Sequence, residues 1–398
     1  MLAGAYQIWR RPRERPGGPA FLAVGALALL ALASAAWSAR VHRTEKSALA
    51  FLILILAAAA LADATARRPE AVRRILEALY AGATLVALLG LLLLSATHTE
   101  AVQAASTQYP ARYRGIGQNP NTVPLLLALA MPLGLWLFET ARTKAGRIAA
   151  ATSVLLLDGS IVASGSRGAL IAALAGSAVW LVTVAGSWRR RLALVAVAAA
   201  VFAADVAVTQ IPKAAPSPPP SRQQGPAHVV RDAQLTHPLE DEIGNPATGG
   251  GGTPIRRTLF GTSGRARAWD AALHQAARRP VAGYGFGTER FVFVDRYYGF
   301  DSSVPENSYI GVLLQLGIVG LVVFLGLGAA LAVAAFTALR GPPGPFRAVA
   351  RACTAVLVAA AVLGLTQSYL TSVGNIAIAI VWIPALLLPA LAAYTRGV

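Results

Sequence analysis

Apolar stretches of about twenty residues recur along almost the whole chain, and they restrict the possible fold more than any other feature. A helix needs about 20 consecutive apolar residues to cross a bilayer core. Hydrophobic residues make up 56% of the 398 residues and charged residues only 13%, whereas a typical soluble domain has about 25% charged residues. The chain is therefore predicted to be an all-α polytopic membrane protein.

We expect ten membrane-spanning segments, joined by mostly short connections. The eighth segment is too long for one straight crossing, and Gly317 and Gly320 are expected to divide it into a short interfacial helix and a membrane helix. The segments are 20–39, 47–66, 75–95, 122–138, 148–164, 169–186, 192–211, 308–339, 352–370 and 376–394.

Lys and Arg are unevenly distributed among the short connections. If the N-terminus is cytoplasmic, the inner connections hold 18 of these residues and the short outer connections hold six. Cytoplasmic connections characteristically carry the excess of positive charge. We therefore attribute the net charge of +17 to topology rather than to nucleic-acid binding, and expect both termini to lie in the cytoplasm. The outer six are Arg40, Arg43, Lys46, Arg112, Arg114 and Arg167.

This topology divides the chain into three regions. Residues 1–211 form a membrane region with seven spans, 212–305 form a long extracytoplasmic loop, and 306–398 form a membrane region with three spans. The basic N-terminus resembles a signal peptide, but the apolar stretch after it exceeds the usual 7–15 residues, so we expect an uncleaved first helix.

The long loop changes character along its length. Its first half is rich in Pro, Gly and Ser and is expected to be flexible. From Thr262 onward we expect a helix that is capped by Ser263, runs through Arg265 and Trp269, and is stopped by Pro280. The following GYGFG is expected to be a tight turn. It is not a dinucleotide-binding motif, because no strand precedes it and no helix follows at the required offset.

Three charged residues are candidates for chemistry at the outer surface. Arg167, in SGSRGAL, is either an interfacial arginine that reaches for head groups or a phosphate ligand. Its small neighbours favour the second interpretation. Arg265 is either a solvated arginine at a helix start or a second phosphate contact. Glu306 is either a favourable helix-start charge or a general base, and these two interpretations are compatible.

Metal and disulfide chemistry have little support in the sequence. The single cysteine, Cys353, lies in an apolar segment and rules out an intrachain disulfide framework. The five histidines show no metal-ligand spacing. We therefore expect no metal site and no cofactor.

Four pieces of sequence in this order resemble a known family. They are GIGQNPNTVPLLLALAMPLGLWL, SGSRGAL, GRARAWDAALHQAARRPVAGYGFGTERF and ENSYIGVLLQLGIVGL, and together they extend over about 115–325. The chain resembles the O-antigen ligase and polymerase superfamily of bacterial membrane glycosyltransferases. The resemblance implies a GT-C-like fold and a metal-independent, inverting transfer. The donor would be an undecaprenyl-pyrophosphate-linked glycan, and the acceptor a lipid A-core sugar or a growing polysaccharide, with no nucleic acid involved.

The resemblance also implies roles for individual residues. Arg167 and Arg265 would hold the pyrophosphate, and Glu306 would take a proton from the acceptor hydroxyl. The ligases usually have histidine at the position of Glu306, so this departure favours a polymerase or a less-studied branch over a true O-antigen ligase. Further substrate contacts are expected from Asn121, Trp269, Asn307 and Tyr309.

A transporter or flippase for lipid-linked glycans is the alternative from another class. Ten spans and Asp158, an acid in the middle of the fifth span, are compatible with transport. Transporters often have repeated halves, and the sequence shows no convincing repeat. A long, one-sided loop that carries the motifs also has no obvious use in transport.

The charge distribution gives a testable topology. Cysteines introduced at Ser221, in the long loop, and at Thr143, in a short connection, are expected to react with an impermeant thiol reagent from opposite sides of the membrane. Labelling of both positions from the same side would contradict the predicted topology.

Overall fold

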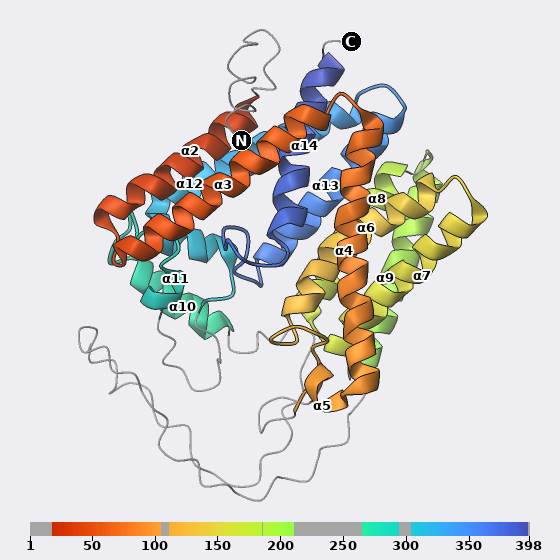
Figure 1. The fold of residues 1–398 in the computed structure, drawn as a ribbon, viewed down its shortest axis with the longest axis horizontal. Helices are drawn as coiled ribbons and strands as arrows, with labels where there is room; N and C mark the ends of the chain where they lie inside the picture. Colours follow the sequence, from red (N-terminus) through yellow and green to blue (C-terminus); the bar gives the residue numbers. More distant parts are fainter. Residues whose placement is uncertain (1–17, 105–110, 185, 211–264, 294–303, 397–398) are drawn as a thin grey trace, which may run out of the picture.

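The computed structural model describes residues 18–104, 111–184, 186–210, 265–293 and 304–396, which form a bundle of long helices (Figure 1). One short antiparallel pair, β1 (Val102–Gln103) with β2 (Arg112–Tyr113), lies between helices. A 3-10 helix, η2 (Ser34–Trp37), follows the first helix. The α-helices are α2 (Pro19–Ala33), α3 (Val41–Thr65), α4 (Pro69–Ala96), α5 (His98–Ala101), α6 (Thr122–Thr140), α7 (Lys144–Ser164), α8 (Arg167–Val184), α9 (Trp188–Gln210), α10 (Arg265–Ala276), α11 (Glu289–Val292), α12 (Ser308–Leu339), α13 (Pro345–Gly364) and α14 (Ile378–Arg396).

The predicted all-α membrane architecture is confirmed. Within the described ranges, nine helices are long and apolar enough to cross a membrane, and α14 is apolar over the shorter stretch Ile378–Ala393. Each of the ten predicted segments overlaps one of these helices, although several helices begin earlier than the apolar run, and α2 and α13 end before the predicted segments 20–39 and 352–370 do. For example, α4 and α13 begin at Pro69 and Pro345, because proline fits the first turn of a helix.

One end of the bundle carries the helices of the long loop. We call it the loop end: it includes α10 and α11, the first residues of α6, α8 and α12, and the last residues of α7 and α13. The start of α2 and the end of α14 lie at the opposite end (Figure 1). Helix α6 is the most buried of the spanning helices and packs against α4, α7, α8 and α13.

Helix α12 is broken at Gly317, which has φ 64° and ψ −164°. The predicted division of this segment is therefore confirmed at Gly317, whereas Gly320 stays helical. The break removes the helical partners of the carbonyls of Leu314 and Gln315 and of the amides of Ile318 and Val319. Unpaired backbone groups are costly where water is absent, so these four groups need other partners.

The glycine turn after α10 supplies those partners. The carbonyls of Leu314 and Gln315 accept hydrogen bonds from the amides of Tyr284 and Gly285 at 3.0 and 2.8 Å. In return, the amides of Ile318 and Val319 donate to the carbonyls of Pro280 and Val281 at 2.8 and 3.3 Å. The extramembrane turn 280–285 and the broken membrane helix therefore complete each other.

Glycine is required for this close approach. A Cβ on Gly317 would lie 2.2 Å from the Val281 carbonyl oxygen, and one on Gly283 would lie 2.6 Å from that of Gln315. Gly283, Gly285 and Gly287 all have positive φ, which confirms the tight turn. On its other side the turn is held by η2, since Phe286 N donates to Ser34 Oγ at 2.9 Å.

Helix α10 confirms the predicted helix through Arg265 and Trp269. The expected cap Ser263 and the Pro/Gly/Ser-rich first half of the loop lie outside the described residues.

Gly317→Ala is expected to destabilise the protein by about 3 kcal/mol or more, because it combines a backbone clash with a left-handed φ. Gly328→Ala in the same helix is the control, since a Cβ there has no atom within 4 Å, and alanine favours a helix by about 0.5–1 kcal/mol. The measurement is the thermal midpoint of the purified protein in detergent. Equal midpoints for the two variants would contradict the role of Gly317.

Candidate functional site

Arg265 and Glu306 form an ion pair at the loop end. Nη2 of Arg265, the first residue of α10, donates to Oε2 of Glu306, which lies just before α12. Each side chain is only 19% exposed, so both charges are largely removed from water, and losing one partner would be costly. Trp269, one turn further along α10, donates Nε1–H to the Pro305 carbonyl at 2.9 Å. Both residues of α10 that the sequence singled out thus contact the segment 305–306.

Glu306 has a left-handed backbone conformation, with φ 49°. It is the one non-glycine residue with positive φ among those that the structure describes. Such a conformation costs about 1–3 kcal/mol and persists only where the surroundings fix it, which is common at functional sites. The Arg265 ion pair is one of the contacts that fix it.

Asn307, and not Glu306, caps α12. Its Oδ1 accepts from the amides of Tyr309 and Ile310 at 3.0 and 3.1 Å, and its Nδ2 donates to the Leu365 carbonyl at 3.1 Å. The first turn of α12 contains no acidic residue, and Glu306 lies directly before the cap. The helix-start charge and the general base both stay predictions for Glu306.

The polar groups of Asn307 and Tyr309 are thus used within the protein. The Tyr309 hydroxyl donates to the carbonyl of Ala361 in α13 at 2.9 Å. The side chain of Asn307 caps α12 and also binds Leu365, the residue after α13. A role in substrate binding stays a prediction for both.

Arg167 is the first residue of α8, directly after a sharp turn. Helix α7 ends at Ser164, and Gly165, with φ 62°, reverses the chain. Gly168, the residue after Arg167, lies so close to the α13–α14 connection that a Cβ on it would be 2.3 Å from Thr366 Oγ1. Arg167 is partly buried. Gly168 is therefore required by the close approach of the chain, and Gly165 by its left-handed conformation.

Arg112 is a buried arginine that the sequence analysis counted only as a loop charge. Its Nε donates to the Ser164 carbonyl at 2.7 Å, and its Nη2 donates to Asn121 Oδ1 at 3.1 Å. The side-chain oxygen of Asn121, a predicted substrate contact, thus accepts from Arg112. The sequence feature that came nearest to indicating the role of Arg112 was its positive charge in an outer connection, where the positive-inside rule disfavours such a charge.

Glu289 is a second residue that the sequence analysis missed. Its Oε1 accepts from Ser368 Oγ at 2.7 Å and its Oε2 accepts from Gln315 Nε2 at 3.2 Å. Burial raises the pKa of Glu289 to about 7, and the hydrogen bond from Ser368 opposes part of this shift.

The connection between α13 and α14 is what brings these motifs together. Leu365 and Ser368 bind Asn307, and Thr366 lies against Gly168. Residues 365–370 of this connection were expected to be part of a membrane span and not part of the site. Because it contacts both the SRG turn and the Glu306–Asn307 segment, it joins the two halves of the predicted site at one end of the bundle.

The arrangement suits the recognition of an anion. Arg112, Arg167 and Arg265 all lie at the loop end, and arginine binds phosphate in a bidentate manner. Within the described ranges, no group of three or more His, Cys, Asp or Glu side chains is placed to hold a metal ion.

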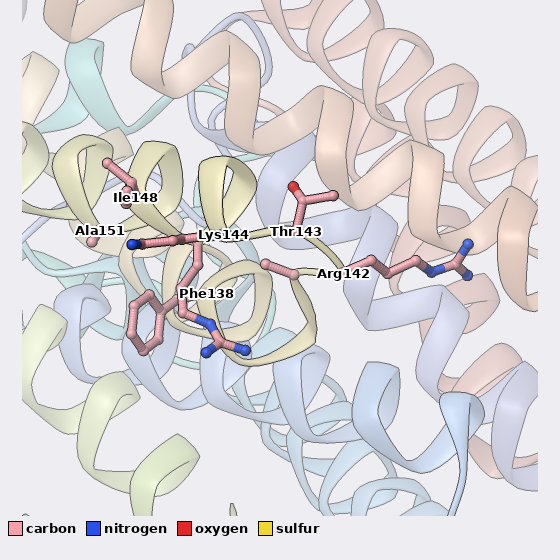
Figure 2. A pocket seen from close by; sticks show the side chains of 8 residues that line it. Phe138, Arg142, Thr143, Lys144, Ile148 and Ala151 are labelled. Carbon is pink, nitrogen blue, oxygen red and sulfur yellow. The ribbon is translucent and has the colours of Figure 1, made fainter.

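A hollow at the α6–α7 turn is separate from this site. Phe138, Arg142 and Lys144 are among the residues that line it (Figure 2). It lies at the start of α7, whereas the SRG turn follows the end of α7, about 30 Å away at 1.5 Å per residue.

Comparison with known proteins agrees with this geometry. Residues 148–325 match the model of the family described as O-antigen ligase, and no curated protein matches the chain. The matched region runs from α7 through the long loop into α12, so it contains Arg167, Arg265 and Glu306 but not Asn121. The match over residues 148–325 therefore supports the resemblance of the chain to the O-antigen ligase and polymerase superfamily.

Proposed function

We propose that the loop end is the active site of a membrane glycosyltransferase that uses an undecaprenyl-pyrophosphate-linked glycan. The acceptor would be a sugar of lipid A-core or of a growing polysaccharide, on the outer face of the inner membrane. The observation that carries this proposal is the Arg265–Glu306 ion pair. It holds a cation suited to phosphate and a carboxylate suited to proton transfer in contact with each other, at one end of a membrane bundle.

The guanidinium of Arg265 has hydrogen-bonding capacity left for a donor substrate. Of its five N–H groups, one on Nη2 is used by Glu306, while the buried Nε has no partner within the described part of the chain. A buried donor without a partner costs about 1–3 kcal/mol. A pyrophosphate oxygen placed against Nε would remove this cost.

Donor binding then prepares the base. When the pyrophosphate binds the guanidinium of Arg265, the Glu306 carboxylate loses its ion-pair partner and becomes able to accept a proton. The acceptor hydroxyl attacks the anomeric carbon from the face opposite the pyrophosphate, and its proton passes to Glu306. The bond from the anomeric carbon to the phosphate oxygen breaks, and undecaprenyl pyrophosphate leaves with its charge neutralised by Arg265 and Arg167. The configuration at the anomeric carbon is inverted.

Reconstitution distinguishes this proposal from transport. Proteoliposomes that contain the purified protein and an undecaprenyl-pyrophosphate-linked glycan should form an elongated or transferred glycan and release undecaprenyl pyrophosphate. Movement of the intact donor between leaflets without any transfer would instead support a flippase.

Arg167→Ala and Arg265→Ala are each expected to lower the transfer rate by about 10²–10³-fold, because each removes a charged contact to the leaving pyrophosphate. Lysine at either position should restore little activity, since it lacks the planar fork. The matched control is Arg278→Ala, an exposed arginine just after α10, which should keep wild-type activity. Full activity in either alanine variant would remove that arginine from the site.

Glu306→Gln is expected to lower turnover by about 10²-fold or more, because glutamine keeps the size of the side chain but cannot take the proton. Histidine at this position should restore part of the rate. Asp270→Asn is the control for loss of one negative charge, since Asp270 is 67% exposed on the same loop. Equal turnover of Glu306→Gln and wild type would rule out the base, although the role of the arginines would still stand.

A further inference from the structure

Glu289 lies outside the groups that the proposed reaction uses, yet it is connected to them by two hydrogen bonds. Ser368 Oγ accepts from the amide of Asn307 at 3.0 Å and donates to Glu289 Oε1 at 2.7 Å. The amide that Ser368 holds belongs to the Glu306–Asn307 peptide. The carboxylate of Glu289 is thus two hydrogen bonds away from the backbone of Glu306.

The second oxygen of Glu289 is tied to the glycine turn. Gln315 Nε2 donates to Glu289 Oε2 at 3.2 Å, and Gln315 Oε1 accepts from the amide of Gly287 at 2.6 Å. The amide of Gln315 is therefore held in one orientation, with its NH₂ group directed at Glu289. Gly311 leaves room for the carboxylate, since a Cβ there would lie 2.7 Å from Glu289 Oε1.

We propose that Glu289 is a positioning residue that sets the Glu306 carboxylate through Ser368 and the Glu306–Asn307 peptide. Glu306 is in a left-handed conformation, which needs external contacts to persist. The side chain of Glu306 is held by Arg265, which is expected to bind the donor pyrophosphate instead. The Glu289–Ser368 contact then keeps the backbone of Glu306 in place while Arg265 exchanges Glu306 for the pyrophosphate. This inference rests on the proposed role of Glu306 as the base.

Both oxygens of Glu289 act as acceptors, which makes glutamine an informative replacement. A carboxylate can accept from Ser368 and Gln315 together, whereas an amide presents one oxygen and one NH₂ group. In Glu289→Gln the new NH₂ would face either Ser368 or the NH₂ of Gln315. If Gln315 turned to relieve this, its own NH₂ would face the amide of Gly287. The isosteric change therefore removes the acceptor of Ser368 or that of Gln315 without creating a cavity.

The first readout is structural and independent of activity. Hydrogen exchange of the peptide that contains Asn307 is measured by mass spectrometry on the wild type, Glu289→Gln, Ser368→Ala and the control Asp270→Asn, all in nanodiscs. Exchange is expected to rise at least tenfold in Glu289→Gln and in Ser368→Ala, and to stay at the wild-type level in Asp270→Asn. Unchanged exchange in Glu289→Gln would overturn the inference.

The second readout is kinetic and uses undecaprenyl-pyrophosphate-linked glycan extracted from cells that lack the protein. Glu289→Gln is expected to lower kcat roughly tenfold or more with KM for the donor unchanged, because small displacements of a catalytic group are costly while the arginines still hold the donor. Glu289→Asp, which keeps two acceptor oxygens, should recover part of kcat. A rise in KM alone would overturn the inference.

A double-mutant cycle separates this inference from the proposed function. If Glu289 acts through Glu306, adding Glu289→Gln to Glu306→Gln should cause no further loss of kcat. Multiplicative losses would mean that Glu289 acts independently of Glu306, and would overturn the inference while leaving the base intact. Full activity of Glu306→Gln alone would instead reject the base, and the exchange measurement would then decide whether Glu289 sets this peptide.

Discussion

The break in α12 at Gly317 is the constraint on which the rest of the loop end depends. A membrane helix normally satisfies its own backbone groups, and a break leaves carbonyls and amides that need partners. Here the turn 280–285 supplies them, through two amides that donate to α12 and two carbonyls that accept from it. The long loop is therefore attached to the membrane region by backbone hydrogen bonds that no side-chain substitution can remove directly. Only glycine permits the close approach at Gly283 and Gly317.

The attachment fixes the position of the charged groups. Helices α10 and α11 lie on either side of the turn, so the turn places Arg265 and Glu289 near the start of α12. Arg265 then pairs with Glu306, and Glu289 reaches Ser368 and Gln315. Arg265 thereby holds the side chain of Glu306, while Glu289 reaches the Glu306–Asn307 peptide through Ser368. A shift of the turn would displace both contacts together, so the glycines contribute to the site although none has a functional side chain.

Much of the fold could be predicted from the sequence, because length and apolar composition determine which segments enter a bilayer. The break at Gly317, helix α10 and the glycine turn also follow from local rules. The cap of α12 at Asn307, the buried Arg112 and the Glu289 network do not. Glu289 and Ser368 are 79 residues apart, and Asn307 and Ser368 are 61 residues apart. Such hydrogen-bonded pairs depend on how the helices pack, and no local pattern in a single sequence indicates that packing. The contacts of the α13–α14 connection were missed for the same reason, since residues 365–370 were assigned to a membrane span.

Two of the six exceptions to the charge bias have a physical explanation if the proposed function is correct. In the predicted topology, arginines on the outer side oppose the rule that places positive charge in the cytoplasm. Arg112 and Arg167 are two of the six exceptions, and both belong to the loop end, where Arg112 binds the turn before Arg167. Partly buried cations at membrane depth are expensive and usually have a function. An anionic substrate would offset that cost when it binds, because its phosphates supply the negative charge that the described part of the site provides mainly through Glu306 and Glu289. The outer arginines reduce the Lys/Arg bias from which the topology was predicted. The proposed pyrophosphate-linked donor would need the same positive charge for its binding.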